Sequence, residues 1–193
     1  MNEAHLTYLA SDDWAERLRS DLLPWVERVG DLGDDVLEVG PGPGRTTDLL
    51  RARCTRVTAI ELDPALAAGL RERLAGTNVD VVQADAADTG LPDGRFSAAA
   101  CFSMLHHVPS AEHQDRVFAE LGRLLRPGGY LLVADAVEHP ALREFHADDT
   151  FVPIDPTTVT TRLTAAGFTD VQVDAGEYEF RLRARRATVA GRG

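Results

Sequence analysis

The feature that most constrains the fold is a regular alternation of short apolar segments with longer segments of helical periodicity. Apolar segments of strand length occur at residues 34–40, 55–63, 78–85, 95–103 and 130–136. Between them, apolar side chains recur at spacings of three and four, as in Leu66, Leu70 and Leu74. Strands that alternate with helices form a parallel sheet with both faces covered. The sequence therefore predicts an α/β fold.

The C-terminal part departs from this alternation. Residues 168–176 and 177–186 are consecutive strand-like segments joined by a tight turn at Gly176, which predicts an antiparallel pair at one edge and seven strands in all. A length of 193 residues suits one domain. We expect a helical cap over residues 1–32, including an amphipathic helix at 11–30, then a core over 33–187 and a tail over 188–193.

Charge and apolar patterning exclude several classes of partner. The formal net charge of −11 argues against the basic face that nucleic acid requires, so no nucleic-acid partner is expected. The N-terminus lacks a basic region followed by an apolar core, and no apolar run approaches the ~20 residues that span a bilayer. We therefore expect a cytoplasmic protein without a membrane partner. Cys54 and Cys101 have no CxxC spacing and are expected to be reduced.

A glycine-rich stretch, VLEVGPGPGRTT at residues 36–47, joins the first strand to a helix. Glycines there allow the backbone to approach a ligand closely and direct a helix N-terminus at it. Glu61 ends the second strand, where doubly wound folds place an acid that accepts ribose hydroxyls, and Asp85 ends the third. Glu61 could instead cap the next helix, but Asp63 already occupies that position. These residues predict a ligand that contains a nucleoside.

Five motifs stand in order along the chain: VLEVGPGPGRTT, VTAIELDPAL, VVQADAADTGLP, FSAAACFSMLHHV and LLRPGGYLLVADA. Together they resemble the motifs of the class I S-adenosylmethionine-dependent methyltransferases, in particular the small single-domain type that acts mostly on small molecules. The resemblance covers residues 33–187. It implies a doubly wound, Rossmann-like sheet of seven strands in the order 3-2-1-4-5-7-6, with strand 7 antiparallel and helices on both faces. A nicotinamide dehydrogenase is disfavoured because the glycine spacing is GxGxG, not GxGxxG.

The resemblance also implies S-adenosylmethionine as cofactor, with S-adenosylhomocysteine as its product. It assigns cofactor contacts to Glu38, Gly40, Gly42, Gly44, Glu61, Leu62, Asp85, Ala86, Phe102 and Ser103. The glycines would pass under the methionine part, with Glu38 directed towards its ammonium group through water. Glu61 would hold the ribose hydroxyls. Leu62, Asp85 and the Ala86 backbone would contact adenine, and Phe102 and Ser103 would border the methionine chain and the sulfonium.

Proton removal from an acceptor is the step that would need a further residue. His106 and His107 follow the fourth strand and Asp135 ends the fifth, so these three are the predicted catalytic residues. The alternative is that one histidine packs or caps the next helix while the other faces solvent, because neighbours in regular structure point in different directions.

Two groups of residues contain enough potential ligands to raise the question of a metal. These are His106, His107 and His113, and His139 and His146 with Asp148 and Asp149. Neither group has a recognised ligand spacing, so the sequence predicts no metal site.

The predicted function is methyl transfer from S-adenosylmethionine to a small molecule. We expect the acceptor pocket to come from residues 1–25 and from the long loop at 137–155, with Tyr8 and Trp14 able to close over a ligand. One alternative is a cofactor-binding relative with a regulatory role, since fold and binding loop do not guarantee chemistry. Another is a protein or RNA methyltransferase, which the acidic charge disfavours.

Overall fold

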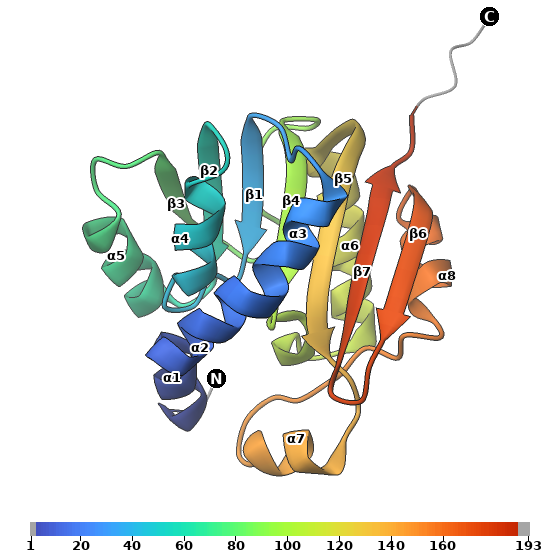
Figure 1. Ribbon diagram of the computed structural model, residues 1–193. Helices are drawn as coiled ribbons and strands as arrows, with labels where there is room; N and C mark the ends of the chain where they lie inside the picture. Colours follow the sequence, from blue (N-terminus) through green and yellow to red (C-terminus); the bar gives the residue numbers. More distant parts are fainter. Residues whose placement is uncertain (1–2, 189–193) are drawn as a thin grey trace, which may run out of the picture.

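The computed structural model describes residues 3–188, and the chain folds around one seven-stranded sheet (Figure 1). The strands are β1 (Asp35–Val39), β2 (Arg56–Glu61), β3 (Val79–Gln83), β4 (Phe96–Phe102), β5 (Leu125–Ala136), β6 (Phe168–Ala175) and β7 (Glu179–Arg186). Their order is β3-β2-β1-β4-β5-β7-β6, and β7 is antiparallel to both of its neighbours. The predicted topology is confirmed. Residues 1 and 2 of the predicted cap and 189–193 of the predicted tail lie outside the described residues.

Successive side chains of the central strands point to opposite faces of the sheet, and each face is covered by helices. Val36 of β1 joins the core that includes Val26, whereas the next residue, Leu37, joins the core that includes Phe118. Both side chains are fully buried. A strand that is buried on both faces has a nearly continuous apolar sequence, and this explains why apolar residues predominate in the central segments.

Five helices outside the N-terminal segment accompany the strands: α4 (Arg45–Arg51), α5 (Pro64–Arg73), α6 (Ala111–Leu124), α7 (Pro140–Phe145) and α8 (Val159–Ala165). Helices α3 and α4 lie on one face of the sheet, and α6 and α8 lie on the other (Figure 1). The N-cap predicted at Asp63 is confirmed, and Ser110 caps α6 in the same way. The Asp63 carboxylate accepts from the backbone N–H groups of Ala65 and Leu66, and the Ser110 hydroxyl accepts from His113.

The helix predicted at 11–30 is confirmed as a helical stretch over residues 12–29, and the N-terminal cap has one further helix before it. Helix α1 (Glu3–Ala10) precedes a break at Ser11, and α2 (Asp12–Arg17), a π-helical turn (Leu18–Leu22) and α3 (Leu23–Val29) follow. The Ser11 hydroxyl accepts from the Trp14 N–H at 3.1 Å, which caps α2. The helical content therefore begins earlier than predicted, and the break allows α1 to turn towards the carboxyl edge of the sheet.

Two other boundaries also differ from the prediction. The strand predicted at 130–136 begins earlier, because the segment RPGG lies within β5, where the pairing with β4 shifts between Phe96 and Ala98. The segment at 137–155, predicted as a long loop, contains the short helix α7. Helices α1 and α7 both lie beyond the edge at which β1, β4 and β5 end (Figure 1).

Two further findings concern the chain as a whole. Cys54 and Cys101 are both free thiols. Across the described residues 3–188, the helices are too short or too polar to cross a bilayer.

Candidate active site

The glycine-rich turn between β1 and α4 has backbone geometry that suits glycine. Gly40, Gly42 and Gly44 have φ angles of +66°, +53° and +84°, a region that side chains with a Cβ rarely adopt. At Gly40, a Cβ atom would lie 2.7 Å from the Met104 Cβ. The turn is held to β2 because the Gly40 N–H donates to the Ile60 carbonyl at 2.9 Å.

Glu38 places a carboxylate beneath this turn. Its side chain is 1 % exposed, and its Oε1 accepts a hydrogen bond from the Thr46 hydroxyl. Its Oε2 is buried and has no hydrogen-bond partner among residues 3–188. Burial raises the pKa of Glu38 to about 7, although the hydrogen bond from Thr46 opposes the shift. A cationic group at this position would favour the charged carboxylate.

Glu61 ends β2 and contacts the same turn. Its carboxylate accepts from the Gly42 N–H at 3.2 Å and from the Asp63 N–H at 2.9 Å. Glu61 is therefore a buried acid directed at the glycine turn, and Asp63 caps α5 instead. The next residue, Leu62, is 66 % exposed, which is unusual for leucine in this position after a buried strand.

Asp85 and Ala86 follow β3 on the same edge. The Asp85 carboxylate accepts from the Ala87 N–H at 2.8 Å and lies 3.2 Å from the His113 Nε2. Burial alone would raise the pKa of Asp85, but these two hydrogen bonds hold it below its usual value. Asp85 is therefore charged at neutral pH.

The end of β4 redirects the chain. Phe102 is buried, and Ser103 has a φ angle of +53°, a conformation uncommon for residues other than glycine. The Ser103 N–H donates to the Ala134 carbonyl at 2.8 Å, so the turn is tied to β5. A short 3-10 helix (Leu105–His107) follows immediately. Such uncommon backbone conformations cluster at functional sites.

This 3-10 turn places both predicted histidines in one group. The ring centroids of His106 and His107 are 4.2 Å apart, and His5 of α1 and His146 after α7 lie against them. The alternative that one ring faces solvent was wrong, because the two residues lie in a tight turn rather than in a regular helix or strand. We call His5, His106, His107 and His146 the imidazole cluster.

Asp135, at the end of β5, fixes the turn and its first histidine. Its Oδ1 lies 2.5 Å from the His106 Nδ1, and its Oδ2 accepts from the Met104 and Leu105 N–H groups at 3.0 and 2.7 Å. Burial alone would raise the pKa of Asp135, but His106 and the backbone donors outweigh burial and hold it below its usual value. Asp135 is therefore a buried anion that orients the His106 ring.

A cavity of about 110 Å³ lies beside this pair. Its lining combines aromatic rings, among them Tyr8, Trp14 and Phe145, with the polar side chains of Ser103 and His106. Residues 1–25 and 137–155 therefore both line a cavity, as predicted for the acceptor pocket. Aromatic walls with a few convergent polar groups are typical of small-molecule sites.

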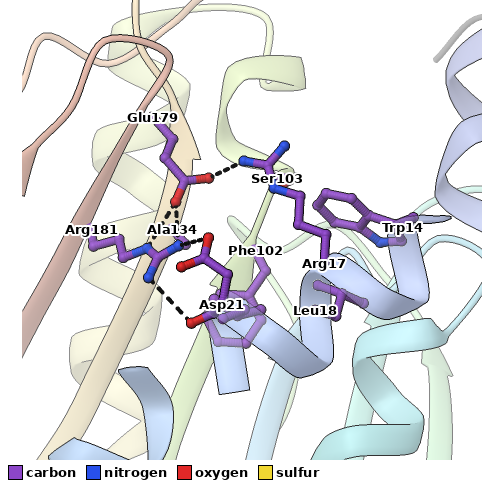
Figure 2. Close-up of a pocket in the computed structure, with 10 residues that line it drawn as sticks. Trp14, Arg17, Leu18, Asp21, Phe102, Ser103, Ala134, Glu179 and Arg181 are labelled. Atoms are coloured by element: carbon purple, nitrogen blue, oxygen red, sulfur yellow. Dashed lines mark hydrogen bonds and ion pairs between the residues drawn. The ribbon is translucent and has the colours of Figure 1, made fainter. Parts of the chain in front are cut away.

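Ion pairs tie the N-terminal cap to β7 along one wall of this region (Figure 2). Arg17 of α2 lies 2.8 Å from the Glu179 carboxylate, and Arg181 lies 2.5 Å from Asp21 and 2.6 Å from Glu179. These contacts join segments far apart in sequence. They position the helices that supply Trp14 and His5 to the site.

Two histidines considered as possible metal ligands in the sequence lie outside the imidazole cluster, and two residues that the sequence did not single out belong to the site. His113 pairs with Asp85, and His139 contacts the Tyr178 ring, so neither belongs to the imidazole cluster. His5 and Gln114 were missed by the sequence analysis. The buried Gln114 amide donates to the Leu105 and Val152 carbonyls and thus joins the 3-10 turn to the loop at 137–155. No short-range pattern around either residue signals these contacts.

Comparison with known proteins agrees with this geometry. The profile of the family described as "Methyltransferase domain" matches residues 37–133. A probable S-adenosylmethionine-dependent methyltransferase of Mycobacterium tuberculosis is 31 % identical over 161 residues, which are 77 % of this chain and 54 % of that protein. A probable ribosomal RNA small subunit methyltransferase A of Haloarcula marismortui is 43 % identical over 94 residues, 47 % of this chain and 32 % of that protein. The chain thus spans about half or less of the length of these relatives.

A solved structure extends the likeness to the whole fold. The crystal structure of a Pyrococcus horikoshii protein superposes with a TM-score of 0.77 at 18 % identity, covering 91 % of this chain and 92 % of that one. The chain belongs to the methyltransferase domain family, within the class I S-adenosylmethionine-dependent methyltransferases. These are enzymes whose cofactor is S-adenosylmethionine.

The residues present fit that cofactor. Glu38 offers a buried carboxylate oxygen that has no partner among the described residues, which suits a site next to a cationic amino group. Glu61 offers a buried carboxylate where ribose hydroxyls bind in doubly wound folds. At Gly42 a Cβ would meet, within residues 3–188, only the Leu9 Cδ1 atom, at 4.0 Å, so the turn is open at that position. The side chains around the turn are carboxylates, which accept hydrogen bonds as a cationic ligand requires.

Proposed function

We propose that the chain transfers the methyl group of S-adenosylmethionine to a small-molecule acceptor bound between the N-terminal cap and the loop at 137–155. The observation that carries this proposal is the buried His106–Asp135 pair, 2.5 Å apart, in the wall of the aromatic cavity. The cavity brings an apolar surface and a proton-accepting side chain together. This combination suits an acceptor with an apolar body and a hydroxyl or amino group.

We propose that the cofactor lies along the carboxyl edge of β1 to β4. The contacts proposed for it are Glu38, Gly40, Gly42 and Gly44 at the methionine part, Glu61 at the ribose, Leu62, Asp85 and Ala86 at the adenine, and Phe102 and Ser103 beside the sulfonium. When bound, the cofactor supplies a methyl group on a good leaving group. Catalysis then depends mainly on holding the acceptor in line with that methyl group, and positioning of this kind contributes several kcal/mol.

In this proposal His106 takes the proton of the acceptor at its Nε2 while Asp135 holds the Nδ1–H and stabilises the positive charge that forms. The arrangement is that of a base with an orienting carboxylate. His107, the other predicted catalytic histidine, does not line this cavity, and its ring packs against His106 with the centroids 4.2 Å apart, so we assign it the role of positioning His106. A base of this type contributes about 10²–10⁴-fold to the rate.

The alternative acceptor is RNA, because one relative is named as a ribosomal RNA methyltransferase. The net charge of −11 opposes binding to a polyanion. The small-molecule assignment is therefore favoured, and the two can be distinguished directly.

The test is transfer of labelled methyl groups from S-adenosylmethionine into a bacterial cell extract, which is then separated into small molecules, RNA and protein. The proposal expects label in the small-molecule fraction and loss of that label in Glu61→Gln. The exposed Glu72 of α5 gives a matched control, Glu72→Gln, that should behave as the wild type. Label confined to RNA or protein would contradict the proposal.

A further inference from the structure

The imidazole cluster holds four nitrogen ligands in one small volume. One potential ligand nitrogen from each of His5, His106, His107 and His146 lies within 4.8 Å of all the others. His5, His106 and His146 are buried, and His107 is partly buried. Four histidines in contact cannot carry several positive charges at once, because like charges at these distances repel strongly. The cluster therefore contains mainly neutral imidazoles.

The hydrogen bonds around the cluster determine which nitrogen of each ring carries its proton. The His146 Nδ1 lies 2.6 Å from the Leu142 carbonyl, and the His107 Nδ1 lies 3.1 Å from the Thr150 carbonyl. A carbonyl oxygen only accepts, so both Nδ1 atoms carry the hydrogen. The His106 Nδ1 donates to Asp135 in the same way. When these three rings are neutral, each presents its Nε2 lone pair.

These lone pairs converge without satisfying one another. The Nε2 atoms of His106 and His146 face each other at 3.2 Å, and two lone pairs at that distance need a proton or a cation between them. The His107 Nε2 is buried and has no hydrogen-bond partner among residues 3–188. A buried acceptor without a partner is costly, so its presence points to a ligand.

We propose that the imidazole cluster is a binding site for a divalent transition-metal cation of the zinc type. Zinc binds histidine nitrogen at about 2.0–2.1 Å in tetrahedral geometry, so two such nitrogens lie about 3.4 Å apart. The 3.2 Å between the His106 and His146 Nε2 atoms is close to this separation. Nitrogens of the other two rings lie within 4.8 Å of this pair, so these side chains would move closer to complete the set.

The surroundings have the features of a metal site beyond the four ligands. Histidines that bind metal usually donate their other N–H to a carboxylate or a backbone carbonyl, which fixes the tautomer and orients the ring. Here Asp135, Leu142 and Thr150 provide those acceptors.

The proposed site departs from the expectation of no metal that came from the sequence. The ligands come from α1, the 3-10 turn and the segment after α7, so no local spacing reveals them. His106 and His146 also line the aromatic cavity. If that cavity takes the acceptor, which rests on the proposed function, the cation would expand to five ligands, bind the acceptor oxygen or nitrogen as the fifth and lower its pKa. His106 would then be a ligand, and its role as base would belong to the metal-free protein.

The test uses the full chain without an affinity tag, freed of metal by dialysis against a chelator and titrated calorimetrically with zinc chloride. We expect one zinc per chain and a higher melting temperature with zinc. His5→Ala and His146→Ala should each weaken zinc binding by about 100-fold or more, and Asp135→Asn by about 10–100-fold. His113→Ala removes a histidine outside the cluster and should retain wild-type affinity.

Two further measurements keep the test independent of folding and of methyl transfer. Circular dichroism compares the fold of each variant, and the visible spectrum of added Co²⁺ reports tetrahedral nitrogen coordination in the wild type. Zinc binding that is equally tight in His5→Ala/His146→Ala, or no zinc binding by the wild type, would overturn the proposal. Binding of S-adenosylhomocysteine is measured separately, so its failure would refute the proposed function and leave the metal site standing.

Discussion

The carboxyl edge of the sheet has two halves with opposite chemistry. The half over β1, β2 and β3 presents carboxylates, Glu38, Glu61 and Asp85, each within a few residues of a strand end. The half over β4 and β5 presents the imidazole cluster, whose members are brought together by α1, a 3-10 turn and α7. One half suits a cationic cofactor rich in hydroxyls. The other half presents imidazole nitrogens that suit either a methyl acceptor or a metal cation.

This difference teaches how each half is encoded. Parallel strands end at one edge, so an acid at the end of each strand reaches the same crevice by topology alone. The imidazole cluster depends on how separate helices pack over that edge. We therefore expect substitutions in one half to leave the other half's ligand largely unaffected.

The largest effect is expected for His106→Ala. Loss of the residue should lower kcat by about 10²–10⁴-fold, because either the base or a metal ligand disappears. Affinity for S-adenosylhomocysteine should stay near the wild-type value, since Glu38, Glu61 and Asp85 belong to the other half. Steady-state kinetics and calorimetry on the same preparation check this. A parallel loss of cofactor affinity would show that the two halves are coupled.

The next effect concerns Glu38 and pH. Its pKa rises from 4.5 in the unfolded chain to about 7 in the fold, so the folded state binds the proton more tightly. Stability should therefore increase as the pH falls from about 7 to 4.5, by about 3 kcal/mol for this group. Denaturant unfolding measures the free energy of unfolding across this pH range, and the increase of about 3 kcal/mol should be present in the wild type and absent in Glu38→Gln. The same dependence on pH in both proteins would refute the buried-carboxylate account.

A smaller effect is expected in the glycine turn. Gly40→Ala should lower the free energy of unfolding by about 1–2 kcal/mol, because φ is +66° and the Cβ would meet Met104. Gly69, on the exposed side of α5, gives a matched control. A Cβ added at Gly69 would have no atom within 4 Å among the described residues, so Gly69→Ala should instead stabilise by about 0.5–1 kcal/mol. Equal effects of the two substitutions would contradict the geometry of the turn.

The smallest effect is expected for Arg17→Ala. The Arg17–Glu179 ion pair is partly exposed, so its loss should cost less than about 1 kcal/mol of stability. Because Arg17 borders the aromatic cavity, the change should alter KM for the acceptor more than affinity for S-adenosylhomocysteine. If the substitution changed only the affinity for S-adenosylhomocysteine, Arg17 would act on the cofactor half of the edge, and this prediction would be contradicted.

The sequence predicted the cofactor half much better than the acceptor half. The alternating segments predicted the parallel strands, and Glu61 and Asp85 followed from strand ends, whereas the strand order came from the resemblance. His5 was missed because its place depends on the break at Ser11 and the packing of α1. The joint orientation of His106 and His107 was missed because it depends on a 3-10 turn and on the left-handed Ser103, which pattern rules for regular structure do not describe.

The most direct test of the central claim is calorimetric titration of S-adenosylhomocysteine into the wild type and Glu61→Gln. Two hydrogen bonds to a charged carboxylate contribute about 3 kcal/mol or more, so affinity should fall by about 100-fold or more in Glu61→Gln. Glu72→Gln should bind as the wild type does. No binding to the wild type, or undiminished binding to Glu61→Gln, would contradict the account.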